Sequence, residues 1–156
     1  DEEELHELIT LKLKARGQTL ASAEGPSGGL LLETLTSAAH SDGIYQGGVL
    51  TWAAQAMGIL GMPRPQAQGQ SGAVLAGLMA DAARDTFTAD FGLATAMTGP
   101  AGRPVEPAGV SEVFIALTSE NDPVIRRIEL PHLDAAWQRE RITIAALHLA
   151  WAHLRN

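Results

Sequence analysis

The sequence predicts an α/β fold with a mixed sheet covered on both faces, and three observations lead to this prediction. Helical and strand patterns alternate over the first two-thirds of the chain, a hairpin pattern follows, and a long helical pattern closes it. Such alternation is typical of parallel strands joined by helices, whereas the hairpin adds antiparallel strands. The length of 156 residues suits one core, so we expect a single domain over residues 1–156.

The first predicted helix covers residues 3–16. Its apolar residues recur at spacings of three and four, acidic residues fill the first turn, basic residues fill the last turn, and Gly17 follows. Residues 19–24 have the pattern of a strand, on which Ser22 and Glu24 should face the same side. A glycine-rich turn at residues 25–29 then leads into a helix.

The middle of the chain predicts further elements of both kinds. A strand is expected at residues 47–52, running into an alanine-rich segment, and residues 62–72 have the composition of a surface loop. Helical spacing follows at residues 73–87 and a buried strand at 91–97. A second Gly/Pro-rich loop covers residues 98–109.

The last third of the chain predicts a hairpin and a helix. Residues 113–117 and 124–130 flank a cluster of turn residues, so they should pair as antiparallel strands. The final helix is expected at residues 134–154, with an apolar stripe that packs in the core or, alternatively, in a subunit interface. The stripe comprises Trp137, Ile144, Leu147 and Trp151.

Composition excludes several classes of function. The chain has 18 acidic and 11 basic residues, a formal net charge of −7, so we expect no nucleic-acid partner. It has no cysteine, which excludes disulfides, thiolate zinc sites and cysteine nucleophiles. Short apolar runs and an acidic start predict no membrane association and a cytoplasmic protein. The histidines lack metal-ligand spacing, so we expect no metal and no cofactor. They are His6, His40, His132, His148 and His153.

Two turns are candidate binding loops because ligands of α/β proteins bind where strands end. In residues 23–29, glycines bare backbone N–H groups at a helix start and could hold a phosphate or carboxylate. The alternative is a sharp turn in which Ser27 is the helix N-cap. Residues 98–102 suit a binding loop or a plain connection equally well.

The motifs, taken in order, resemble one known family. Residues 19–31, TLASAEGPSGGLL, are similar to the pattern T-L-A-T-A-E-S-C-T-G-G-L-L, and residues 47–52 to G-G-V-V-x-Y. Residues 80–100 resemble a region ending in T-G-x-A-G-P, residues 113–117 resemble V-W-I-A-L, and residues 139–147 resemble R-E-R-x-x-x-A-A-L. These patterns belong to the CinA C-terminal domain family of competence/damage-inducible proteins, which includes nicotinamide mononucleotide deamidases.

This resemblance implies a fold, an assembly and a reaction. The implied fold is a three-layer α/β/α sandwich with a mixed, mostly parallel sheet of about five strands, and the implied assembly is a homo-oligomer. The implied reaction is hydrolysis of the carboxamide of nicotinamide mononucleotide to the acid and ammonia. It uses a serine in A-E-S-C-T-G-G as nucleophile and a lysine in N-E-A-K as base.

This chain departs from the family at both catalytic positions. The serine falls on Gly25 and the lysine on Met57. Glycine has no hydroxyl and a thioether cannot accept the proton, so hydrolysis by that route is excluded. The family's S-N-E-A-K reads AAQAM at residues 53–57, and its K-P-V-G reads AGVS at residues 108–111. We therefore predict no catalytic residues in this chain.

A vestigial ligand site remains as a prediction, with a small nucleotide or anion as the ligand. Arg139 and Arg141 could pair with a phosphate; the alternative is that they face solvent and pair with Glu140 or Asp134. The predicted site residues are Glu24, Gly25, Ser27, Gly28, Gly29, Thr51, Met57, Thr98, Gly99, Arg139 and Arg141.

Three hypotheses of function follow. The leading one is a CinA-like pseudoenzyme that has lost the Ser/Lys dyad and serves as a binding or assembly protein. The first alternative is an active nicotinamide mononucleotide amidohydrolase that uses displaced catalytic residues. The second is a purely structural oligomer that binds no ligand.

Overall fold

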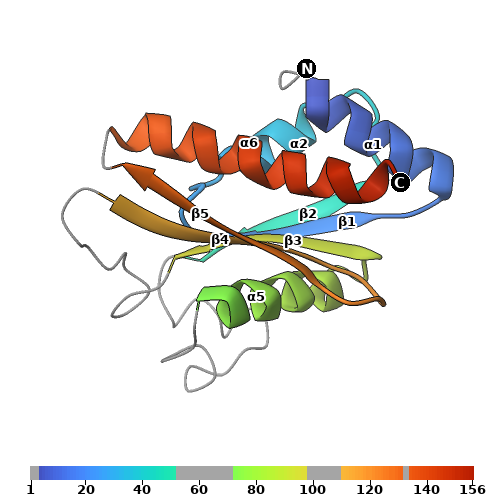
Figure 1. The fold of residues 1–156 in the computed structure, drawn as a ribbon. Helices are drawn as coiled ribbons and strands as arrows, with labels where there is room; N and C mark the ends of the chain where they lie inside the picture. Colours follow the sequence, from blue (N-terminus) through green and yellow to red (C-terminus); the bar gives the residue numbers. More distant parts are fainter. Residues whose placement is uncertain (1–3, 52–71, 98–109, 132–133) are drawn as a thin grey trace.

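The computed structural model describes residues 4–51, 72–97, 110–131 and 134–156 (Figure 1). One sheet lies between two layers of helices. Helices α1 (Leu5–Arg16), α2 (Leu30–Thr36) and α6 (Ala135–Leu154) cover one face, and α5 (Gly72–Thr86) covers the other. The three-layer α/β/α arrangement predicted from the sequence is thereby confirmed.

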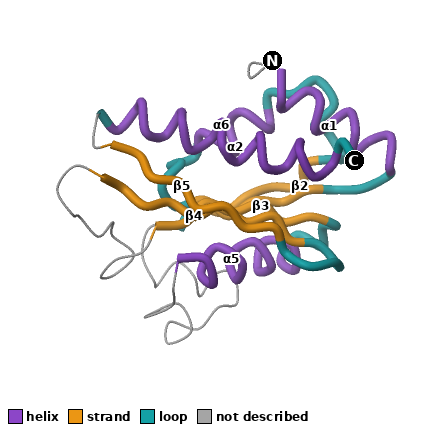
Figure 2. The backbone as a smooth tube through the Cα atoms, in the orientation of Figure 1, coloured by secondary structure: helices purple, strands orange, loops and turns teal. Residues whose placement is uncertain are grey.

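The sheet has five strands in the order β2-β1-β3-β4-β5 (Figure 2). The strands are β1 (Leu20–Glu24), β2 (Tyr45–Leu50), β3 (Phe91–Met97), β4 (Val110–Thr118) and β5 (Val124–Pro131). β1 pairs in parallel with β2 and β3, whereas β4 pairs antiparallel with both β3 and β5. The mixed sheet is confirmed. All strands except β4 point the same way, as expected for a mostly parallel sheet. Because β4 lies between β3 and β5, however, two of the four strand pairings are parallel and two are antiparallel.

The two faces of the sheet bury side chains of different size. The face under α1, α2 and α6 is packed with large aliphatic residues, among them Ile9, Leu13, Leu31, Leu93 and Ile115. The face under α5 is built largely of alanine. α5 lies so close to the sheet that a Cβ added at Gly92 of β3 would stand 2.0 Å from the Ala80 carbonyl oxygen. Small residues therefore set the height of α5 above the sheet.

Most predicted elements agree with the structure to within a few residues, and β3 has the predicted bounds. The predictions for residues 53–60 and 98–109, and for 62–71, lie outside the described residues. The predicted stripe on α6 is corrected in part: Leu147 is buried, but the two tryptophans and Ile144 are only half-buried. The fully buried positions also include Ile142, Ala146 and Ala150. Within the described ranges, no helix has the length and apolarity needed to cross a bilayer.

Candidate functional site

The candidate site is built around the carboxylate of Glu24, the last residue of β1. This side chain is only 1% exposed and faces the layer of α2. Its Oε1 accepts hydrogen bonds from Ser27 Oγ (2.7 Å) and from the backbone N–H groups of Gly29 (3.2 Å) and Leu31 (2.9 Å). Its Oε2 accepts from the N–H of Leu32 (3.0 Å). Glu24 thus caps α2 from the strand that precedes it.

The glycine turn has its donors satisfied inside the protein. Besides the amides held by Glu24, the N–H of Gly28 donates to the Gly25 carbonyl (3.1 Å) and the N–H of Leu30 to the Ser27 carbonyl (3.1 Å). Every backbone N–H from residue 28 to residue 32 therefore has an internal acceptor. The place that the sequence suggested for a bound phosphate or carboxylate holds the protein's own carboxylate.

Ser27 does not have the N-cap role that the alternative interpretation gave it. The N-cap residue is Gly29, with φ 99°, and glycine has no side chain with which to cap. Ser27 is fully buried, and its single hydroxyl proton is donated to Glu24 Oε1. In the second hydrogen bond of Ser27, to Thr95 Oγ1 at 2.7 Å, Thr95 is therefore the donor. The result is a buried chain of hydroxyl groups that ends on the carboxylate.

Gly25 lies directly after β1, at the position where the sequence resemblance predicts a nucleophile. Its N–H donates to the Thr95 carbonyl at 2.9 Å. A Cβ built there would stand 3.2 Å from that carbonyl oxygen and 3.5 Å from the carbonyl oxygen of Thr51. Thr51 is itself 4% exposed and donates through its N–H (2.6 Å) and its Oγ1 (3.2 Å) to the Glu24 carbonyl. A Cβ at this position would therefore be tight against the Thr95 carbonyl oxygen and in ordinary contact with that of Thr51.

Beside this turn lies a groove with a volume of about 330 Å³. It is lined by Gly28, Gly29, Leu30, Glu33, Ala136 and Arg139. The aliphatic stem of Arg139 crosses Gly28 so closely that a Cβ there would stand 2.8 Å from Arg139 Cδ, and Gly28 has φ 62°. Arg139 Nε donates to the Ala135 carbonyl at 3.4 Å. The guanidinium is therefore tethered at Nε, while the side chain is exposed.

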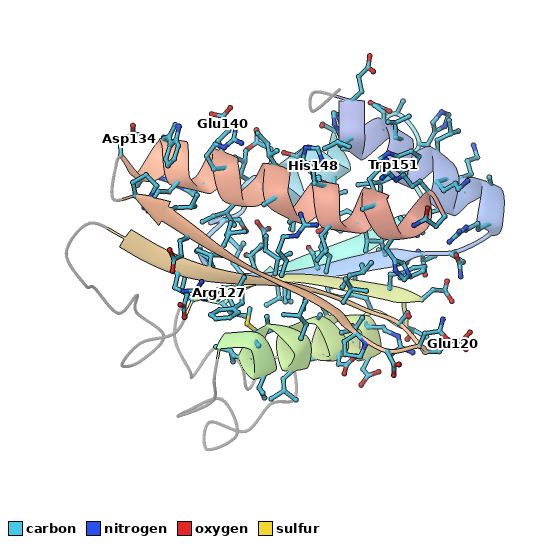
Figure 3. All side chains as sticks on the ribbon, in the orientation of Figure 1. Glu120, Arg127, Asp134, Glu140, His148 and Trp151 are labelled. Atoms are coloured by element: carbon cyan, nitrogen blue, oxygen red, sulfur yellow. The ribbon has the colours of Figure 1, made fainter. Side chains whose placement is uncertain are left out.

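The two arginines predicted for the site are placed differently. Arg141 is exposed on α6 and does not line the groove. Asp134, labelled in Figure 3 at the start of α6, accepts from the N–H of Trp137 (2.8 Å) and caps the helix. Among the described residues, neither arginine forms an ion pair with Asp134 or Glu140, as the alternative interpretation proposed. The predicted site residues Met57, Thr98 and Gly99 lie outside the described residues.

Next to Glu24 the structure shows a buried polar pair that sequence reasoning missed. Ser22 Oγ and Tyr45 Oη lie 2.6 Å apart, on the same side of the sheet as Glu24. Burial raises the pKa of Tyr45 to about 12; the bond to Ser22 acts in the opposite direction, and the charge of Glu24 adds to the rise. Gly48 makes room for the pair, since a Cβ there would stand 2.5 Å from Ser22 Oγ. Gly48 is the one feature of the sequence that could have indicated this polar pair.

The described residues do not bring three His, Asp or Glu side chains together in a way that could hold a metal ion. Their chemical resources at the candidate site are one tethered guanidinium, one exposed carboxylate at Glu33, and small apolar surfaces. Such a set can bind and orient a small polar molecule. It contains no nucleophile paired with a base.

Comparison with known proteins gives consistent results. The sequence profile of the CinA C-terminal domain matches residues 2–154. A CinA-like protein of Anaeromyxobacter sp. (strain Fw109-5) is 36% identical over 119 residues, covering 73% of this chain and 29% of that protein. A CinA-like protein of Desulfovibrio desulfuricans is 30% identical over 157 residues, covering 96% of this chain and 36% of that protein. The chain thus spans about a third of the length of these relatives.

Solved structures are similar over nearly the whole chain. The competence/damage inducible protein CihA from Agrobacterium tumefaciens superposes with a TM-score of 0.84 at 23% identity, covering 100% of this chain and 96% of the other. A CinA superfamily protein from Escherichia coli superposes with a TM-score of 0.75 at 26% identity, covering 99% of this chain and 89% of the other. By sequence profile, relatives and fold together, this chain belongs to the CinA C-terminal domain family.

Proposed function

We propose that this chain is a non-catalytic CinA-like domain that binds a small anionic ligand, such as a nucleotide, in the groove beside Arg139. One observation carries the proposal: Gly25 stands where the family resemblance puts the nucleophile, and two backbone carbonyl oxygens border it. A hydrolase of the implied kind needs a hydroxyl and a proton acceptor at this point. Position 25 supplies no hydroxyl.

Among the described residues, the groups next to Gly25 do not supply the missing chemistry. Ser27 is fully buried, and its proton is committed to a carboxylate that already accepts three backbone N–H groups. A lysine base is also missing from this region, because the chain's two lysines, Lys12 and Lys14, both lie on α1. They sit near the end of α1 that leads into the start of β1, whereas Glu24 and Gly25 are at the other end of that strand.

The groove favours binding of an anion that also carries hydroxyl groups. A guanidinium offers a planar pair of donors to phosphate or carboxylate oxygens, and contact with Gly28 restricts the Arg139 stem before any ligand arrives. Glu33 lines the same groove and can accept hydrogen bonds from hydroxyl groups. A phosphorylated sugar combines both features, which supports a nucleotide over an inorganic ion.

Two measurements on purified protein test this proposal. Incubation with nicotinamide mononucleotide should release no ammonia above a buffer blank, whereas steady release would show an amidohydrolase with displaced residues. Thermal unfolding with the same nucleotide should show a rise in midpoint that grows with concentration. At about one hundred times Kd the gain is about 2.7 kcal/mol, or a rise of about 5–10 °C for a domain of this size.

Two matched variants locate the binding. Arg139→Gln should abolish the nucleotide-dependent rise in midpoint, while Arg141→Gln, which removes the same charge from the same helix outside the groove, should retain it. An equal loss in both variants would show a general charge effect rather than a site. A wild-type midpoint that ignores nicotinamide mononucleotide, adenosine monophosphate and inorganic phosphate alike would contradict the binding proposal and favour a purely structural role.

A further inference from the structure

Strand β5 is an edge of the sheet. It stands last in the strand order, and its outer side pairs with no strand among the described residues. On the sheet, helices α5 and α6 pack more on β4 than on β5 (Figures 1 and 2). The outward-facing backbone groups of such a strand are a template for pairing with another strand, although Pro131 has no N–H and its carbonyl accepts from Gln138 Nε2 at 2.9 Å.

The side chains on the α5 face of this edge carry an unbalanced charge. Glu112 of β4 and Glu129 of β5 stand directly opposite each other in the sheet register, an arrangement that is unfavourable for like charges. Arg127, labelled in Figure 3, compensates: its Nε donates to Glu112 Oε2 at 2.6 Å, and its Nη2 pairs with both carboxylates. Two carboxylates share one guanidinium, and all three side chains are partly exposed at this edge.

The charges along β5 are complementary to those of a second copy of the strand in one antiparallel register. When an edge strand pairs antiparallel with its own copy, side chains of one face oppose each other and one residue lies on the two-fold axis. With Arg127 or Glu129 on the axis, identical charges would meet. With Ile128 on the axis, each Arg127 opposes the partner's Glu129, and residues 125–131 all find partners.

The same register also brings apolar side chains together. Ile125, which is 40% exposed, would oppose the partner's Pro131 on the α5 face. On the other face Ile128 would meet its own copy. Among self-pairings of β5, this register alone combines full length with opposite charges across the strands.

We propose that two copies of this chain associate by antiparallel pairing of their β5 edges, with Ile128 at the two-fold axis and reciprocal ion pairs between Arg127 of each protomer and Glu129 of the other. The two sheets then join into one continuous sheet. This proposal does not depend on the ligand site, which lies at the end of β1.

Charge reversal tests the pairing directly. Arg127→Glu and Glu129→Arg each place like charges opposite one another at two symmetric positions, so each should weaken the dimer at least about tenfold by sedimentation equilibrium. The double variant Arg127→Glu/Glu129→Arg restores opposite charges across the axis and should restore dimerisation. Its second substitution also places a guanidinium opposite Glu112, so each protomer keeps an internal ion pair. Arg141→Glu, exposed on α6, is the control for net charge and should dimerise normally.

Three outcomes would overturn the proposal. The wild-type chain could remain a monomer at all concentrations. Both single reversals could dimerise as well as the wild type, which would place the interface elsewhere. Alternatively, the double variant could stay dissociated while its circular dichroism shows a native fold.

Cysteine cross-linking gives a second readout, because the natural chain has no cysteine. In the proposed register residue 128 faces its own copy at a Cα distance of about 4.5–5.5 Å, within the range that a disulfide spans. Ile128→Cys should therefore form a covalent dimer when dissolved oxygen oxidises the two thiols to a disulfide. Val124→Cys, on the same strand and face, lies far from its copy and should not cross-link. Cross-linking of Val124→Cys in preference to Ile128→Cys would refute the register.

Discussion

Replacing Glu24 by glutamine tests the claim that this carboxylate holds the strand, the turn and α2 together. The side chain keeps its shape but loses its charge and one acceptor oxygen. If its carbonyl takes the place of Oε1, its NH₂ group faces the N–H of Leu32, and two donors then meet in a buried space. The three remaining hydrogen bonds persist but are no longer charge-assisted.

The magnitude follows from these contacts. A hydrogen bond to a charged group contributes about 1.5–3 kcal/mol and a neutral one about 1 kcal/mol, so three weakened bonds lose about 2 kcal/mol or more. The unpaired Leu32 N–H adds about 1–3 kcal/mol. We expect Glu24→Gln to lower the free energy of unfolding by about 3–5 kcal/mol, which corresponds to a fall in Tm of about 10 °C.

Urea unfolding followed by circular dichroism measures this loss, with Glu33→Gln as the matched control. Glu33 lies in the first turn of α2 and is exposed, so its replacement should change stability by less than about 0.5 kcal/mol. If Glu24→Gln costs under about 1 kcal/mol, or no more than the control, the capping role assigned to Glu24 is refuted.

Three further predictions concern Tyr45, the packing of α5, and catalysis. The pKa of Tyr45 is about 12 in the folded protein and 10.0 in the unfolded chain. Its contribution to the free energy of unfolding is therefore constant below pH 10 and falls by up to about 2.7 kcal/mol as the pH rises to 12. Tyr45→Phe should lack this fall when unfolding is measured against pH. Gly92→Ala should destabilise the domain by at least about 1–3 kcal/mol because its methyl meets a helix carbonyl, whereas Gly77→Ala, whose nearest new contact is 3.8 Å away, should stabilise α5 by about 0.5–1 kcal/mol in thermal melts. Gly25→Ser with Met57→Lys should release no ammonia from nicotinamide mononucleotide, because residues around both positions also differ from the family pattern.

Each of these predictions has a contrary result. Tyr45 is the only tyrosine, so tyrosinate absorbance that is half-developed near pH 10 in the folded protein would contradict the raised pKa. A Gly92→Ala variant as stable as the wild type would show that α5 can lift away from the sheet without cost. Clear turnover by the double variant would mean that only the dyad had been lost.

The periodic parts of the chain made the fold predictable. β3 and the hairpin strands follow from short apolar runs between turn residues, and Gly17, in the left-handed conformation, ends α1 as its position suggested. The stripe on α6 was predicted less well because tryptophans dominated the pattern. In the structure, smaller residues such as Ala146 and Ala150 lie deepest, because their size lets the helix approach its neighbours.

The sequence indicated the turn after β1 as a candidate site but not how its groups are arranged. Sequence patterns place a helix cap immediately before the helix, yet the cap of α2 is the carboxylate of Glu24, which the turn folds back over the helix start. Arg139 and Arg141 were indistinguishable in sequence, but two positions on a helix differ by about 200° in direction. Only Arg139 therefore reaches the groove.

The alanine layer beneath α5 has a consequence for anyone who alters this protein. Where large aliphatic residues interdigitate, one shape can replace another if the total volume is kept. At Gly92, beneath α5, the nearest atom is the main-chain oxygen of Ala80, so no neighbouring side chain can shrink to make room for an added methyl group. In a library that randomises the buried residues on both faces of the sheet, folded variants should have varied aliphatic residues under α1, α2 and α6. Under α5 they should keep alanine and glycine at nearly every position that has them now.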